Sequence, residues 1–120
     1  MSELPRPIGA IARIAHIIGP AAALALAEAR GGTHVYVPKE PSASCPLVKI
    51  VGMEAAVILA AAYGGDTIKV PVGREWRVMV LRAGETSYAR IALSLGIDEN
   101  TVHRILKQQD MTNRQLRLFE

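Results

Sequence analysis

Residues 88–107 read YARIALSLGIDENTVHRILK. Two helices that cross steeply through a tight turn require a small residue at the crossing, a glycine at the turn and a polar cap on the second helix. Ala92, Gly96 and Asp98 meet these three requirements in order, because glycine tolerates positive φ and aspartate caps helix N-termini. The segment therefore predicts a helix-turn-helix.

The apolar residues of this segment fall at helical spacing. Its expected core consists of Ile91 in the first helix, Ile97 at the turn, and Val102, Ile105 and Leu106 in the second helix. Upstream, residues 74–83 predict a further helix that ends at Gly84 and contributes Trp76, Val80 and Leu81. The Thr86–Ser87 pair offers an N-cap for the helix that follows. We therefore expect a three-helix unit over residues 74–108.

Such a unit places its second helix in the major groove of duplex DNA, where outward side chains reach base edges. The candidates on this helix are Glu99, Asn100, His103, Arg104 and Lys107. Asparagine suits bidentate pairing with adenine and arginine with guanine, whereas Lys107, near the helix C-terminus, is expected at a phosphate. Candidate phosphate contacts at the first helix are Ser87, Tyr88 and Arg90. The acidic pair Asp98–Glu99 argues against this interpretation, because it brings negative charge toward the groove.

A duplication precedes this unit. Residues 17–38 read IIGPAAALALAEARGGTHVYVP and residues 50–71 read IVGMEAAVILAAAYGGDTIKVP, at an offset of 33 residues and with 11 of 22 positions identical. Each copy predicts an alanine-rich helix, a Gly-Gly pair whose first glycine closes the helix in the left-handed conformation, and a strand stopped by proline. The expected helices span 20–30 and 53–63, and the expected strands span 34–37 and 67–70.

The predicted strands need partners, because a lone strand of four residues is not stable. They can pair with each other inside one chain or with copies in a second chain, and the sequence leaves both arrangements open. The alanine-rich composition buries little area per side chain, which favours a homodimer that completes the core. A helix over 8–18, a polar loop over 39–46 and a flexible tail over 109–120 are also expected.

The predicted fold class is therefore mainly α with a small β element. An N-terminal dimerisation region of helices and strands spans residues 1–73, and the helix-turn-helix domain spans 74–108. Whether the duplicated region only supports the fold or also contacts DNA stays open at this point.

Composition excludes several classes of function. The formal net charge of +3 suits a polyanionic partner. The single cysteine, Cys45, excludes an internal disulfide and a cysteine zinc site within one chain, and the three histidines lack ligand spacing. We predict no catalytic residue, metal or cofactor, and hence no enzyme. Since neither a signal peptide nor a membrane span is evident, a cytoplasmic protein that does not contact membranes is expected.

Residues 20–108 resemble the Mor/C regulators of transposable phages. The likeness is carried by Gly31-Gly32-Thr-His-Val-Tyr-Val-Pro38-Lys39, by its echo Gly64-Gly65 to Pro71, and by the helix-turn-helix that follows. In that family a helical dimerisation region and a glycine-bounded strand precede a C-terminal helix-turn-helix, and polar strand residues approach the minor groove. The resemblance implies such contacts for His34 and Tyr36, or for Thr67 and Lys69. The duplicated strand unit departs from the family pattern, and the helix-turn-helix is also similar to that of resolvases and transposases.

The predicted function is a sequence-specific transcription regulator that binds double-stranded DNA as a homodimer on a two-fold site, with RNA polymerase as a candidate partner. Two alternatives remain. One is an accessory DNA-binding protein of recombination, transposition or packaging. The other is a protein-interaction adaptor, in which the helix-turn-helix is only a packing module.

Overall fold

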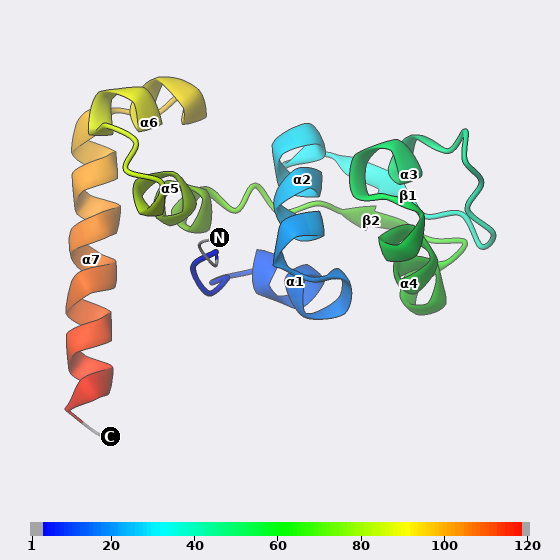
Figure 1. Cartoon of the computed structure of the whole chain (residues 1–120), viewed down its shortest axis with the longest axis horizontal. Helices are drawn as coiled ribbons and strands as arrows, with labels where there is room; N and C mark the ends of the chain where they lie inside the picture. The colour runs from blue at the N-terminus through cyan, green and yellow to red at the C-terminus, as the bar shows by residue number, and fades with distance from the viewer. Residues whose placement is uncertain (1–3, 119–120) are drawn as a thin grey trace. The chain divides into compact units, whose positions relative to one another are not determined.

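The computed structural model describes residues 4–118. Over these residues the chain is mainly helical with a small two-stranded antiparallel sheet, as the sequence predicted (Figure 1). It divides into two compact units, Leu4–Gly73 and a second unit that begins at Arg74. None of the helices in the described part of the chain combines the length and apolarity that crossing a bilayer requires.

The first unit contains two copies of one helix–helix–strand module. The first copy consists of α1 (Ile11–Ile18), α2 (Pro20–Arg30) and β1 (His34–Tyr36), and the second of α3 (Pro46–Val51), α4 (Met53–Tyr63) and β2 (Thr67–Lys69). Proline opens both α2 and α3, since its missing N–H costs no hydrogen bond in the first turn of a helix. Helix α3 was not predicted, because six residues are too few to show a periodic pattern.

Strands β1 and β2 pair with each other inside the chain, and they lie between the helices of the two copies (Figure 1). Val35 faces Ile68 at the centre of the ribbon. Because these two residues are separated by the 33-residue offset of the duplication, the pairing has an approximate two-fold axis at its centre. Of the two arrangements that the sequence left open, the structure therefore shows pairing within one chain.

Hydrogen bonds at the ends of the ribbon follow the same two-fold symmetry. The Gly32 N–H donates to the Val70 carbonyl over 2.8 Å, and the equivalent Gly65 N–H donates to the Val37 carbonyl over 2.7 Å. Val37 and Val70 are both fully buried. Each copy thus closes the sheet of the other, and the ribbon is completed without a second chain.

The prediction that the first glycine of each Gly-Gly pair is left-handed is wrong. Gly31 and Gly64 have φ of −52° and −55°, which any residue adopts. The second glycines, Gly32 and Gly65, carry the positive φ values of 85° and 89°. The helices end at Arg30 and Tyr63, as predicted, but it is the second glycine of each pair that turns the chain into the strand.

The first glycines are required by space instead. A Cβ on Gly31 would lie 2.5 Å from the Ala27 carbonyl oxygen and 3.2 Å from the Cα of Val72. A Cβ on Gly64 would lie 2.5 Å from the carbonyl oxygen of Ala60 in its own helix and 3.2 Å from the Cα of Lys39 in the other copy. The backbone following one strand thus crosses the helix end of the other copy in direct contact, and a side chain would separate them.

The second unit contains α5 (Arg74–Ala83), α6 (Tyr88–Leu95) and α7 (Glu99–Arg117). Its buried cluster consists of Val78, Ile91, Ala92, Val102 and Ile105, and the predicted Leu81, Ile97 and Leu106 pack against this cluster. Trp76 is fully buried and Val80 half-buried. Val78 was not predicted as a core residue, because a window of ten residues leaves the buried face of α5 ambiguous.

Helix α7 continues to Arg117, past residue 108, where the sequence predicted the start of a tail. The residues from Asp110 to Leu118 are exposed. The helix persists because the segment contains no glycine or proline, and because Arg114 and Asp110 form an i,i+4 ion pair at 3.3 Å. The last two positions of the predicted tail lie outside the described residues.

Candidate nucleic-acid interface

The turn between α6 and α7 has the geometry that its sequence predicts. Gly96 adopts the left-handed conformation, with φ 66° and ψ 35°. The Ile97 N–H donates to the Ala92 carbonyl over 3.0 Å, and the Ile97 side chain packs against the buried cluster. Ala92 and Val102 are both buried, as expected where two helices cross closely. The two helices are therefore joined as in a helix-turn-helix.

The two helix starts differ in how they are capped. Ser87 is the N-cap of α6, and its hydroxyl accepts a hydrogen bond from the Arg90 N–H over 3.2 Å. Asp98 is the N-cap residue of α7 by position, but among the described residues its side chain makes no capping hydrogen bond. The Thr101 N–H donates to the Asp98 carbonyl over 3.0 Å, so in the first turn of α7 the N–H groups of Glu99 and Asn100 are left to solvent or to another acceptor.

The predicted base-reading residues share one exposed face of α7. Val102 and Ile105 point into the core of the unit. The residues of the opposite face are exposed; they are Glu99, Asn100, His103, Arg104 and Lys107. Among residues 4–118 the ion pairs are Arg74–Glu75 and Arg114–Asp110, so the cations of this face are not neutralised there by carboxylates.

The three candidates at the start of α6 are placed differently from one another. Ser87 and Arg90 are exposed, whereas Tyr88 is half-buried and packs against the core of the unit. The Ser87 hydroxyl accepts a hydrogen bond from the backbone as the helix cap. Its own hydrogen remains free to donate to an anion. Tyr88 contributes mainly by packing.

Tyr88 connects all three helices of the unit. Its ring centroid lies 4.2 Å from that of His103 on α7, at an interplanar angle of 59°. The guanidinium of Arg82 on α5 lies 4.9 Å from the same ring, and this side chain also donates to the Thr86 carbonyl over 3.1 Å. Arg82 was not among the predicted site residues, because only the turn between α5 and α6 brings it to Tyr88. The cluster fixes the position of His103 relative to the start of α6.

The Tyr88–His103 contact makes a measurable prediction. In a double-mutant cycle of Tyr88→Leu and His103→Ala, we expect a coupling energy of about 0.5–1.5 kcal/mol, the usual range for aromatic pairs. Leucine keeps apolar packing at position 88 while it removes the ring. Urea unfolding followed by circular dichroism supplies the four free energies. Additive effects of the two substitutions would show that the rings do not interact.

The predicted strand residues also meet on one surface. Val35 is buried on the inner side of the ribbon. The first and last residues of both strands are exposed. The exposed face carries two cross-strand pairs, His34 with Lys69 and Tyr36 with Thr67. The sequence offered His34 and Tyr36 or, alternatively, Thr67 and Lys69. The structure brings all four together, because antiparallel pairing puts opposite residues on the same side of a sheet.

A hollow lies beside β1. Its volume is about 340 Å³, and it is lined by residues that include Arg30, His34, Tyr36, Cys45 and Leu47. The Arg30 guanidinium donates to the Thr33 hydroxyl over 3.2 Å and to the His34 carbonyl over 3.3 Å. Arg30 thus adds a cation at the rim of the ribbon, in a position that the sequence did not indicate.

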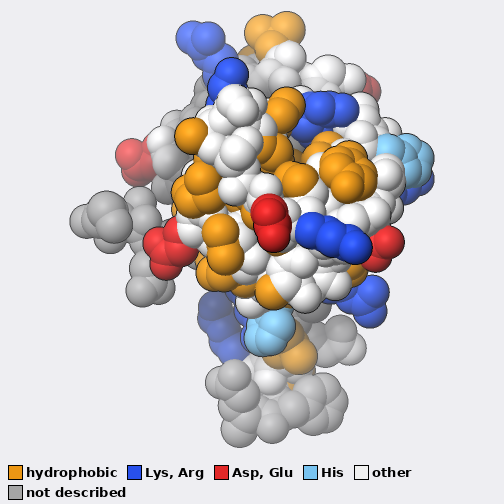
Figure 2. Space-filling model, turned by 90° about the vertical axis from the view of Figure 1, so that its right-hand side faces the viewer, with side chains coloured by type: hydrophobic (Ala, Val, Ile, Leu, Met, Phe, Trp, Pro, Cys, Tyr) orange, Lys and Arg blue, Asp and Glu red, His pale blue; other side chains and the backbone are white. Residues whose placement is uncertain are grey.

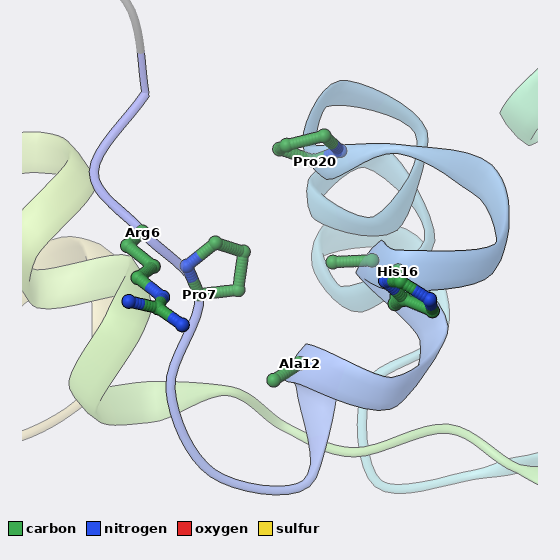
Figure 3. A pocket seen from close by; sticks show the side chains of 6 residues that line it. Arg6, Pro7, Ala12, His16 and Pro20 are labelled. Carbon is green, nitrogen blue, oxygen red and sulfur yellow. The ribbon is translucent and has the colours of Figure 1, made fainter.

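A second hollow of about 340 Å³ lies between the segment before α1 and the helices that follow it (Figure 3). Arg6 and Pro7 line one side, and Ala12, His16 and Pro20 line the other. Its titratable lining residues are Arg6 and His16, so it offers no nucleophile paired with a carboxylate. Within residues 4–118, no cluster of three or more His, Cys, Asp or Glu side chains is arranged to hold a metal ion.

No family model matches the chain, and neither a curated protein nor a solved structure matches it.

Proposed function

We propose that this protein is a sequence-specific DNA-binding regulator of transcription. The observation that carries the proposal is the exposed face of α7, which presents Asn100, Arg104 and Lys107. This helix follows α6 through a tight turn at Gly96. Asparagine and arginine are the two side chains best suited to bidentate recognition of adenine and guanine. In this assignment α7 lies in the major groove, and the start of α6 faces a phosphate.

The charges of the unit suit this orientation. Arg104 and Lys107 follow the acidic residues Asp98 and Glu99 by about two helical turns. The acidic pair stabilises the start of α7 through the helix dipole, and its negative charge directs the phosphate contacts to the basic residues further along the helix. The basic half of the exposed face then lies along the groove, between the phosphates of the two strands.

The ribbon supplies a second candidate DNA contact. Its exposed face combines the Lys69 ammonium, the His34 imidazole and the hydroxyls of Tyr36 and Thr67. These groups can donate to phosphate oxygens and to the acceptors that line the minor groove. A two-fold ribbon of this kind is compatible with the approximate two-fold symmetry of a DNA backbone, and Arg30 at its rim adds positive charge.

In the proposed complex the protein acts as a homodimer. Each chain carries one helix-turn-helix, which reads one half-site, and two chains place two such units about one helical turn apart on a two-fold site. Since the ribbon is complete within one chain, it leaves no strand for a partner to pair with at its centre. The contact between chains therefore does not replace the pairing of β1 with β2.

A fluorescence-anisotropy titration tests the proposal. Purified protein is added to labelled random-sequence duplex DNA at two salt concentrations. Binding that releases counterions from about six phosphates weakens by roughly a thousandfold between 50 and 200 mM salt. We expect this steep dependence, and we expect Lys107→Ala to reduce the slope of log affinity against log salt by about one unit.

The result also separates the proposal from an adaptor function. An adaptor would leave the anisotropy of the DNA unchanged at low salt, and that outcome would remove the proposal. A protein that binds DNA steeply but does not alter transcription from a promoter carrying its selected site would instead serve recombination, transposition or packaging.

A further inference from the structure

The outer face of α4 is exposed and, apart from Glu54 in the first turn, hydrophobic. Met53, Val57 and Ile58 leave 42%, 52% and 43% of their surface accessible, and Ala61 and Ala62 continue the face toward the end of the helix. Figure 2 looks onto the molecule from the side of α3 and α4 and shows hydrophobic side chains over much of it. A helix that is hydrophobic on all sides is usually covered on all sides.

Helix α2, the counterpart of α4 in the first copy, does not share this hydrophobic outer face. At the positions equivalent to Ile58 and Ala61, α2 carries Ala25 and the charged Glu28. Ala25 is half-buried, and Glu28 is exposed as a charged residue should be. In α4 the larger side chain replaces the smaller one and the charge is lost, so that residues 55–65 contain no charged residue at all.

We propose that a second copy of this chain covers the outer face of α4, with the two α4 helices packed against each other across a two-fold axis. In such an isologous contact every residue meets the same surface of its partner, so a charged face would bring like charges together. Residues 55–65 carry no charge, and the carboxylate of this face, Glu54, lies in the first turn of α4. Antiparallel packing of two α4 helices keeps the two Glu54 side chains at opposite ends of the contact, whereas a charged partner would lose solvation at the neutral part without gaining a counter-ion. The small Ala61 and Ala62 allow the helix axes to approach closely.

A hollow lies beside this face. It has a volume of about 280 Å³ and adjoins the first turns of α4, and its lining combines Ile18, Val51 and Ala55 with Ile58 and Glu54. Val57, next to Ile58, protrudes from the same face with more than half of its surface exposed. A two-fold contact can therefore place a protruding apolar side chain of each copy at the hollow of the other. This inference deepens the proposed function, in which the protein binds DNA as a homodimer. It rests on the proposed function, because that function supplies the reason for two chains to associate.

The duplication supplies a matched pair of variants for the test. Ala62→Glu and Ala29→Glu introduce the same charge at equivalent exposed positions of α4 and α2. Val57→Glu serves as a second change within the proposed contact. Light scattering coupled to size-exclusion chromatography, over a hundredfold range of protein concentration, measures the mass of each protein without DNA. Circular dichroism checks that each variant keeps the helical content of the parent chain.

We expect the parent chain and Ala29→Glu to reach twice the chain mass of 12.9 kDa. Ala62→Glu and Val57→Glu should stay folded but lose dimer affinity by about a hundredfold or more, because like charges would face each other in the contact. A parent chain that remains monomeric, or variants of Ala62 and Val57 that remain dimeric, would overturn the inference. DNA affinity is not part of this measurement, so its outcome is independent of whether the chain binds DNA.

Discussion

Replacing Asn100 and Arg104 with alanine is expected to abolish most of the preference of this protein for its selected DNA site. Each bidentate contact contributes about 1–3 kcal/mol of discrimination, so the double variant should lose roughly 30-fold to 25,000-fold in specific affinity. Both side chains are exposed on α7 and take no part in the buried cluster, which means that the fold should be retained. Site selection from a random library followed by competition titrations measures the effect.

Lys107→Ala is the matched control for this experiment. It removes an exposed cation from the same face of the same helix, one turn after Arg104. A phosphate contact weakens binding to all sequences about equally, so this variant should lose affinity without losing preference. If the double variant of Asn100 and Arg104 kept the preference of the parent chain, α7 would not be the helix that reads bases.

Replacing Gly31 or Gly64 with alanine is expected to produce a large loss of stability. The added Cβ would lie 2.5 Å from a carbonyl oxygen of the preceding helix and 3.2 Å from the backbone of the other copy. Backbone atoms cannot move aside as a flexible side chain can. Overpacking of this kind costs typically 1–3 kcal/mol, and we expect each substitution to reduce the free energy of unfolding by about 2–3 kcal/mol. Urea unfolding followed by circular dichroism provides the measurement.

Gly84→Ala gives the comparison. A Cβ at this position would meet its nearest atom, the Leu81 carbonyl oxygen, at an ordinary 3.5 Å. Alanine there should therefore leave stability unchanged or raise it by about 0.4–1 kcal/mol, because it restricts the unfolded chain. Equal stability of the variants of Gly31 and Gly84 would show that the two copies do not cross as closely as the structure describes.

The helices of residues 74–108 and the turn at Gly96 were predicted well because their determinants are local. Gly96 has the left-handed conformation that only the turn requires, and Ser87 caps the helix that begins one residue later. The apolar residues recur at helical spacing, so Ile91, Val102 and Ile105 were assigned to the core from their positions alone. Such features depend on neighbours within about five residues, which the sequence displays directly.

The sequence predicted that the helices end at the Gly-Gly pairs, but it did not predict the role of each glycine. Their sequence indicates the end of a helix, and the helices do end there. The sequence does not show which glycine needs its conformation and which needs its lack of a side chain. Gly31 needs space because Val72 crosses it, and that neighbour is 41 residues away along the chain. Arg82 was missed for a related reason, since its contact with Tyr88 depends on the course of the intervening turn.

The sequence by itself determined most of the helices and both strands, the duplication in the first unit, and the exposed residues in the first half of α7. Each of these follows from periodicity, from capping residues or from repeated letters, all of which are local or linear properties of the chain. Only the tertiary structure decided that β1 pairs with β2 within one chain, which joins all four strand candidates on one face. Pairing within a chain and pairing between chains satisfy the same backbone hydrogen bonds, so the distinction depends on how the connecting segments pack and not on the strands themselves.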